Sequence, residues 1–183
     1  MNGPAIGIAV TSLSHFDVVY MAEGGYLWTP FARAGLYPEF ASSIMFPKLM
    51  GDHVAMEMLL LSKKLSAEEA NNCGFVNELF PAGEGFEAAV LARLAEQLEM
   101  SGPPGDYQRE TFMQYKALVK KDVTLQEIQA ATVEENALQA QRQKDGTAEK
   151  AREYLSKIGF GPSAKAKAET VKAEAAAGTS ARL

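Results

Sequence analysis

One carboxylate in apolar surroundings is the residue of this chain best suited to proton-transfer chemistry. Glu39 is the one charged residue between Arg33 and Lys48, within the run A-G-L-Y-P-E-F-A-S-S-I-M-F-P. Loss of water raises the pKa of a carboxyl group, and a pKa near neutrality suits a general acid/base. The residue equally fits the first turn of a helix that begins after Pro38, where it would complement the helix dipole and face water. The local sequence leaves both interpretations open.

The composition is that of an ordinary globular protein and narrows the classes of function. The chain has 183 residues, of which 47% are hydrophobic, and this is enough for one domain with a sizeable core. A net charge of −5 gives no general electrostatic basis for binding nucleic acid. The single cysteine, Cys73, excludes an internal disulfide and fits a reducing compartment. The apolar stretches are too short to span a bilayer, so we expect no membrane span.

Metal and nucleotide motifs are not found in the sequence. The two histidines, His15 and His53, and Cys73 are scattered and do not have the spacing of a zinc site. The sequence contains no G-x-x-x-x-G-K-[ST] loop, and its glycines do not form a dinucleotide-binding fingerprint. We therefore expect no metal site.

Short strands followed by helices are predicted for the first half of the chain. Their continuous apolar character is typical of an α/β protein whose strands are covered on both faces. Ser66 and Glu69 have the spacing of a helix capping box. The predicted strands are residues 5–13, 16–21, 26–31 and 75–80, and the predicted helices are residues 42–50 and 53–62.

The second half is predicted to be helical. Thr124 and Glu127 form a second capping box, and the Met and Leu residues of these helices are expected in the core, as are Tyr154 and Ile158. Three lysines, Lys116, Lys120 and Lys121, are candidates for contacting the phosphates of a ligand, but a solvated helix end is the preferred interpretation. After Pro162 too few large apolar residues remain to offset the entropy of ordering, which predicts a mobile tail. The predicted helices are residues 86–100, 107–120, 125–143 and 147–158.

Four segments of the first half carry a pattern that is characteristic of one family. They read N-G-P-A-I-G-I-A-V-T (2–11), F-D-V-V-Y (16–20), T-P-F-A-R-A-G-L-Y-P-E-F-A-S-S-I-M-F-P-K-L-M-G (29–51) and A-M-E-M-L-L-L-S-K-K-L-S-A-E-E-A-N-N-C-G-F-V-N-E-L-F-P (55–81). The chain resembles the crotonase, or enoyl-CoA hydratase/isomerase, superfamily, and within it the peroxisomal Δ3,Δ2-enoyl-CoA isomerases. The resemblance implies the C-terminal part of a crotonase-type β-β-α spiral (1–82), a helical oligomerisation region (83–160) and a tail (161–183).

The resemblance also separates two reaction types. The two glutamates of family hydratases fall on Thr11 and Phe31 here, and neither residue transfers protons. The isomerases use a single glutamate in the P-E segment, which falls on Glu39. One carboxylate is sufficient for that reaction, because it takes a proton from C2 of a 3-enoyl-CoA and returns it at C4. The resemblance therefore favours the catalytic interpretation of Glu39 and an isomerase that forms 2-trans-enoyl-CoA in fatty-acid β-oxidation.

The remaining site residues are also implied by the resemblance. The N–H of Ile8, on the loop after Ala5 and Gly7, is expected to hold the thioester oxygen of the dienolate. Gly7 would allow the backbone to approach the ligand closely. Phe31 and Pro38 are expected to line the substrate site. No cofactor is expected, because the substrate itself carries coenzyme A.

Partners and location complete the prediction. The family implies an acyl-CoA substrate and a homotrimer. The C-terminal Ala181-Arg182-Leu183 matches a peroxisomal targeting tripeptide, which predicts an import receptor as partner and a location in the peroxisome or a related organelle such as the glycosome.

The likeness begins part-way through the family's domain. The early family motif S-G-x-x-F-S/C-A/S-G-x-D is not found, so the chain is expected to be N-terminally truncated, with exposed apolar edges at 5–13 and 16–21. Two alternatives follow. One is a non-catalytic or inactive crotonase-fold fragment that binds CoA, and the other is an enoyl-CoA hydratase.

Overall fold

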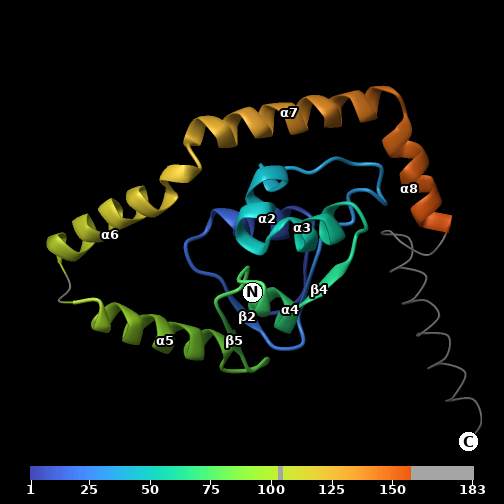
Figure 1. The fold of residues 1–183 in the computed structure, drawn as a ribbon. Helices are drawn as coiled ribbons and strands as arrows, with labels where there is room; N and C mark the ends of the chain where they lie inside the picture. Colours follow the sequence, from blue (N-terminus) through green and yellow to red (C-terminus); the bar gives the residue numbers. More distant parts are fainter. Residues whose placement is uncertain (103–104, 158–183) are drawn as a thin grey trace, which may run out of the picture.

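Two small sheets lie at the centre of the protein (Figure 1). The computed structural model describes residues 1–102 and 105–157. In the first sheet β1 (Ala5–Ile6) runs parallel to β3 (Tyr26–Trp28), and β4 (Lys64–Ser66) pairs with β3 antiparallel. In the second sheet β2 (Tyr20–Ala22) runs parallel to β5 (Glu78–Phe80).

Helices of the first half pack around the sheets, and those of the second half form an arc outside them (Figure 1). Within this arc α7 passes over α2, and the two helices are in contact. The helices of the first half are α1 (Ile8–Thr11), η1 (Ser12–His15), α2 (Ser42–Met50), α3 (Asp52–Leu59) and α4 (Ala67–Asn72). Those of the second half are α5 (Phe86–Met100), α6 (Asp106–Val119), η2 (Lys120–Asp122), α7 (Leu125–Lys144) and α8 (Thr147–Lys157).

The main core joins both sheets to the first four α-helices. Phe46 of α2 is fully buried and packs edge to face against Phe75, with 5.3 Å between the ring centroids. Met21 of β2, Leu27 of β3 and Met58 of α3 belong to the same cluster. The core therefore fixes α2, and with it the loop that precedes α2.

Both predicted capping boxes are confirmed. The Ser66 hydroxyl accepts a hydrogen bond from the Glu69 N–H at 3.1 Å, and the Thr124 hydroxyl accepts one from the Glu127 N–H at 3.2 Å. The carboxylate of each glutamate in turn accepts a hydrogen bond from the N–H of its capping residue. These bonds satisfy N–H donors that the first helical turn leaves without a partner. The bounds of α2 and α5 are those predicted.

The strand predicted for residues 5–13 is wrong beyond Ile6. Gly7, with φ 63°, turns the chain, and the residues after it form α1 and η1. Val10 and Leu13 are buried in the main core from this helical backbone, so tertiary packing outweighs their β propensity. The strand predicted for 16–21 begins only at Tyr20, and β4 was not predicted.

The prediction of buried stripes on the later helices is also wrong for many residues. Their apolar faces follow helical spacing, but no other element of the described chain covers them fully. The exposed residues on the later helices include Leu91, Leu94 and Leu98 of α5, Met113 of α6, Leu125 of α7 and Tyr154 of α8. On the earlier helix α3 and at its end, Met56, Leu60 and Leu61 are exposed as well. Ile158 and the tail lie outside the described residues. The predicted exposure near the N-terminus is present at Ile6, Phe16 and Val18.

Removing the Phe46 ring should test the role of the core. We expect Phe46→Ala to lower the free energy of unfolding by about 3–5 kcal/mol, because the ring is fully buried and leaves a cavity. Urea denaturation followed by circular dichroism measures the change. Leu61→Ala, at an exposed position, is the control and should change the free energy by less than about 0.5 kcal/mol. Equal losses in the two variants would contradict the assignment of this core.

Candidate active site

Glu39 lies in the loop that leads into α2. The helix begins at Ser42, so the interpretation of Glu39 as a first-turn residue is wrong. The Glu39 carbonyl instead accepts a hydrogen bond from the Ser42 N–H at 3.1 Å. Its half-buried side chain carries a carboxyl group whose pKa is raised by burial and, secondarily, by the negative charge of Glu135. A raised pKa is the property that the catalytic interpretation requires.

The backbone just after Glu39 is strained. Phe40 has φ 60° and Ala41 has φ 57°, both in the left-handed region that favours glycine. Such a conformation costs on the order of 1–3 kcal/mol per residue and persists only where the surroundings hold it. Contacts from elsewhere in the chain must therefore fix this loop.

Glu135 of α7 is one source of such contacts. Its side chain is buried, with the residue 5% exposed, and its carboxylate accepts three hydrogen bonds from the start of α2. The donors are the Ala41 N–H at 2.8 Å, the Ser43 N–H at 3.0 Å and the Ser43 hydroxyl at 2.6 Å. Glu135 thereby caps α2, whose N-cap residue, Ala41, has no side chain able to do so.

The sequence analysis missed Glu135, although a signal for it exists. The spacing of Ile128, Ala131 and Leu138 places them on one side of the helix, and Glu135, seven residues after Ile128 and four after Ala131, falls on the same side. A glutamate on an apolar stripe is a candidate for a buried charge with specific partners. The partners themselves could not be read from the sequence.

His15 of η1 supplies a second contact to the loop. Its Nε2 lies 2.8 Å from the Phe40 carbonyl oxygen, and because a carbonyl only accepts, His15 donates here. The two rings pack edge to face with centroids 4.9 Å apart. The Phe40 carbonyl and the Ala41 N–H belong to one peptide group, so His15 and Glu135 hold that group at its two ends.

The structure places Gly7 and Phe31 at one edge of the first sheet. β1 and β3 are parallel, so their carboxyl ends meet there. The Gly7 N–H donates to the Trp28 carbonyl at 2.8 Å, and, its two chain neighbours aside, no atom of the described residues lies within 4 Å of where a Cβ on Gly7 would be. Phe31 is buried, and its carbonyl accepts from the Leu36 N–H at 2.8 Å, which folds the chain back toward the Glu39 loop.

The other predicted residues occupy different settings. Ala5 is buried within β1, Ile8 begins α1 with an exposed side chain, and Pro38 is half-buried beside Glu39. Within residues 1–102 and 105–157 no hydrogen bond or ion pair links the Glu39 side chain to Ile8 or Phe31. Their roles toward a substrate therefore stay predictions.

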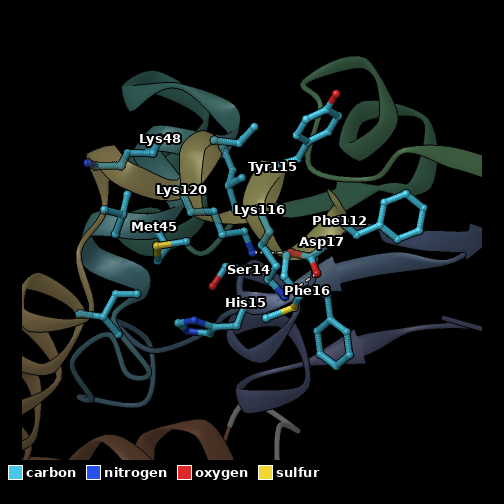
Figure 2. A pocket seen from close by; sticks show the side chains of 15 residues that line it. Ser14, His15, Phe16, Asp17, Met45, Lys48, Phe112, Tyr115, Lys116 and Lys120 are labelled. Atoms are coloured by element: carbon cyan, nitrogen blue, oxygen red, sulfur yellow. Dashed lines mark hydrogen bonds and ion pairs between the residues drawn. The ribbon is translucent and has the colours of Figure 1, made fainter. Parts of the chain in front are cut away.

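A cavity of about 900 Å³ opens between η1, α2 and α6 (Figure 2). His15 lies in its wall and also contacts Phe40, so the cavity adjoins the Glu39 loop. On the other side Lys116 and Lys120 each form an ion pair with Asp17 at 2.6 Å, which lowers the pKa of the Asp17 carboxyl. The side chains of Lys116 and Lys120 stay solvent-exposed, as expected for a solvated helix end, and both are in addition paired with Asp17. The apolar lining consists of Phe16, Met45, Leu49, Phe112, Met113, Val119, Val123 and Ile128.

The described part of the chain shows neither a metal-ligand cluster nor a membrane helix. Across its two ranges, no three His, Cys, Asp or Glu side chains gather as they would around a metal ion. In the same ranges, no helix combines the length and apolar character needed to cross a bilayer.

A family model described as "Enoyl-CoA hydratase/isomerase" matches residues 1–161. The chain belongs to the enoyl-CoA hydratase/isomerase family. A crystal structure of an enoyl-CoA hydratase/isomerase from Pseudoalteromonas atlantica is similar, with a TM-score of 0.73 and 30% identity over 88% of this chain and 61% of that one. The predicted family and the crotonase-type α/β fold are thereby confirmed.

Two curated relatives match about half of the chain. The mouse protein named "Enoyl-CoA delta isomerase 3, peroxisomal" is 46% identical over 101 residues, which are 55% of this chain and 32% of the relative. The rat "Enoyl-CoA delta isomerase 2" is 50% identical over 94 residues, 51% of this chain and 24% of the relative. The matched part thus spans a third or less of these relatives.

The raised pKa of Glu39 predicts a pH-dependent effect on stability. Because the folded-state pKa lies above the unfolded value, the folded state binds more protons between the two, and stability falls as the pH rises through that window. We therefore expect Glu39→Gln to be more stable than the wild type at about pH 8, with the difference shrinking toward about pH 4.

Urea unfolding at several pH values measures this difference. Glu84→Gln, which replaces an exposed glutamate, is the matched control and should show no such dependence. A Glu39→Gln variant whose stability difference from the wild type is constant with pH would show that the carboxyl group is not perturbed.

Proposed function

We propose that this chain carries the isomerase site of an enoyl-CoA isomerase that converts a 3-enoyl-CoA to the 2-trans-enoyl-CoA. The observation that carries the proposal is the half-buried Glu39, whose carboxyl pKa is raised, at the position of the isomerase glutamate. By the resemblance, Thr11 and Phe31 fall where hydratases have their two glutamates; both residues are buried, and neither has a carboxyl group. The isomerase names of the mouse and rat relatives support the same reaction.

In the proposed reaction Glu39 acts as one base and then as the acid. Its carboxylate takes the proton from C2, and the C–H electron pair forms a C1–C2 double bond while the carbonyl π pair moves onto the thioester oxygen, which gives a dienolate. When the dienolate collapses, the carbonyl group re-forms, the C1–C2 pair becomes the C2–C3 double bond, and the C3–C4 pair takes up a proton at C4. The protonated carboxyl group then returns the proton to C4, so no water is consumed. Negative charge accumulates on the thioester oxygen, for which we propose the Ile8 N–H as a donor, beside the open face of Gly7.

We further propose that the cavity beside the loop takes the acyl chain. Its lining is largely apolar, and its wall residue His15 contacts the residue that follows Glu39. A fatty-acyl chain buried there would be desolvated by apolar side chains while its thioester end stays near Glu39. The acyl-CoA would bring its own coenzyme A, so the proposed reaction requires no other cofactor.

Location and assembly are proposals of the same kind. A peroxisomal location is supported by the name of the mouse relative. The targeting tripeptide Ala181-Arg182-Leu183, through which an import receptor would bind, and the predicted mobile tail lie outside the described residues. A homotrimer would offer partners for the exposed apolar residues of α5, such as Leu91 and Leu98. The division of the chain at residues 82 and 160 likewise stays a prediction.

Replacing the Glu39 carboxyl group tests the reaction. We expect Glu39→Gln to lower kcat for isomerisation of a 3-enoyl-CoA by about 10²–10⁴-fold, since the variant keeps the size of the side chain but not the base. Formation of the 2-trans-enoyl thioester is followed by absorbance, and Glu84→Gln is the control.

Two outcomes would contradict the isomerase proposal. Unchanged turnover in folded Glu39→Gln would exclude Glu39 as the base. Wild-type protein that hydrates 2-trans-enoyl-CoA faster than it isomerises would support the hydratase alternative, and binding of acyl-CoA without turnover would support a non-catalytic one.

Narrowing the cavity tests its role in holding the acyl chain. We expect Met113→Trp to raise KM more for a long-chain than for a short-chain 3-enoyl-CoA, because Met113 lines the cavity on α6. Met100→Trp, at an exposed position of α5 away from the cavity, is the control. Equal effects on long and short substrates would place the chain elsewhere.

A further inference from the structure

Side chains on one face of α7 contact the Glu39 loop both before and after Glu39. Glu135, Gln139 and Arg142 are spaced four and three residues apart, which places them on a single face of the helix. The Gln139 Oε1 accepts from the Tyr37 N–H at 2.9 Å, and the Arg142 guanidinium lies 5.1 Å from the centre of the Tyr37 ring. Because Glu135 binds Ala41 and Ser43, α7 contacts the loop before and after the carboxylate.

The contacts converge on the backbone that the strained residues occupy. The peptide group between Phe40 and Ala41 donates to Glu135 and accepts from His15. Rotation of that peptide group would break both hydrogen bonds. It would also relieve the backbone strain of the left-handed conformation at Phe40 and Ala41, so without these bonds the group would tend to rotate. Glu135 therefore opposes the relaxation that would move Glu39.

The buried charge of Glu135 is balanced by α2 rather than by a cation. No ion pair to Glu135 occurs within the described residues, and its three hydrogen bonds come from the N-terminus of α2, the positive end of the helix dipole. The titratable and charged groups that contacts bring to this loop are Glu135 and Arg142 from α7 and His15 from η1. Of these, Glu135 carries the negative charge that disfavours ionisation of Glu39.

We propose that Glu135 is a positioning residue for Glu39. Through its bonds to Ala41 and Ser43 it holds the peptide that follows Glu39. The catalytic consequence rests on the proposed isomerase function. Whether Glu135 holds the loop and perturbs the Glu39 carboxyl group can be measured by NMR in a protein without enzymatic activity.

Two variants of the full chain separate the hydrogen bonds from the charge. Glu135→Gln keeps the length of the side chain and an acceptor but removes the charge. Glu135→Asp keeps the charge but is one methylene too short to reach both Ala41 and Ser43. Glu134→Gln, at the exposed neighbouring position of α7, is the matched control.

The first readout is NMR of protein labelled with ¹³C in its glutamate side chains. The Glu39 carboxyl signal is assigned by its loss in Glu39→Gln. We expect its pKa to fall in Glu135→Gln, because the nearby negative charge is removed, and to change little in Glu134→Gln. Amide hydrogen exchange at Ala41 and Ser43 should accelerate in Glu135→Asp.

The second readout is the kinetics of 3-enoyl-CoA isomerisation. We expect kcat to fall by about 10²-fold in Glu135→Asp with KM little changed, because Glu135 is buried and acts through the position of Glu39. In Glu135→Gln the acid limb of the kcat/KM profile should move to lower pH. Ser43→Ala, which removes one donor to Glu135, should lower kcat less and provides a milder variant should both Glu135 variants unfold.

The outcomes distinguish this inference from the proposed function. An unchanged Glu39 pKa together with unchanged amide exchange in folded variants would overturn the positioning role, whatever the activity. If the wild-type protein lacks isomerase activity while the Glu135 variants show the changed Glu39 pKa and the faster amide exchange, the proposed function is overturned and the positioning role stays supported. The positioning role would also be overturned if the Glu135 variants lost activity only in proportion to their loss of folded protein and their pH profile did not move.

Discussion

The contact between the Glu135 carboxylate and the N-terminus of α2 determines the geometry around Glu39. It joins a helix of the outer arc to the core helix that follows the Glu39 loop, and it satisfies N–H donors that Ala41 cannot cap itself. A buried carboxylate is costly unless it is fully hydrogen-bonded, and here three donors meet it. Because the same bonds hold a strained peptide, the position of Glu39 depends on a residue far away in the sequence.

The setting of Glu39 illustrates a conflict between stability and reactivity. Burial and a nearby negative charge make its ionised form unfavourable, and both effects act against folding at neutral pH. The same effects give the carboxyl group a stronger affinity for a proton, which a shuttling base needs. Packing of the core around Phe46 and Phe75 stabilises the fold and offsets the unfavourable ionisation of the half-buried Glu39.

In the arc of later helices, helical periodicity correctly identifies the apolar faces but does not determine whether they are buried. Leu91, Leu94 and Leu98 of α5 have the spacing of a buried stripe, yet all three are exposed. Periodicity identifies which side of a helix is apolar, and only the neighbouring elements determine whether that side is covered. The curved path of α5 to α8 around the core leaves part of these apolar faces without a cover in the described residues (Figure 1).

The amino-acid sequence alone was sufficient to predict both helix caps, the bounds of two helices, the family and the candidate base. Capping boxes at Ser66 and Thr124, the bounds of α2 and the apolar setting of Glu39 depend on residues close together in the chain, so local rules predict them. Three features depend on packing between distant segments: residues after Gly7 form α1, Glu39 lies outside the helix, and Glu135 contacts Ala41, 94 residues away. Such contacts are set by packing of distant segments, and no local pattern encodes which two segments will meet.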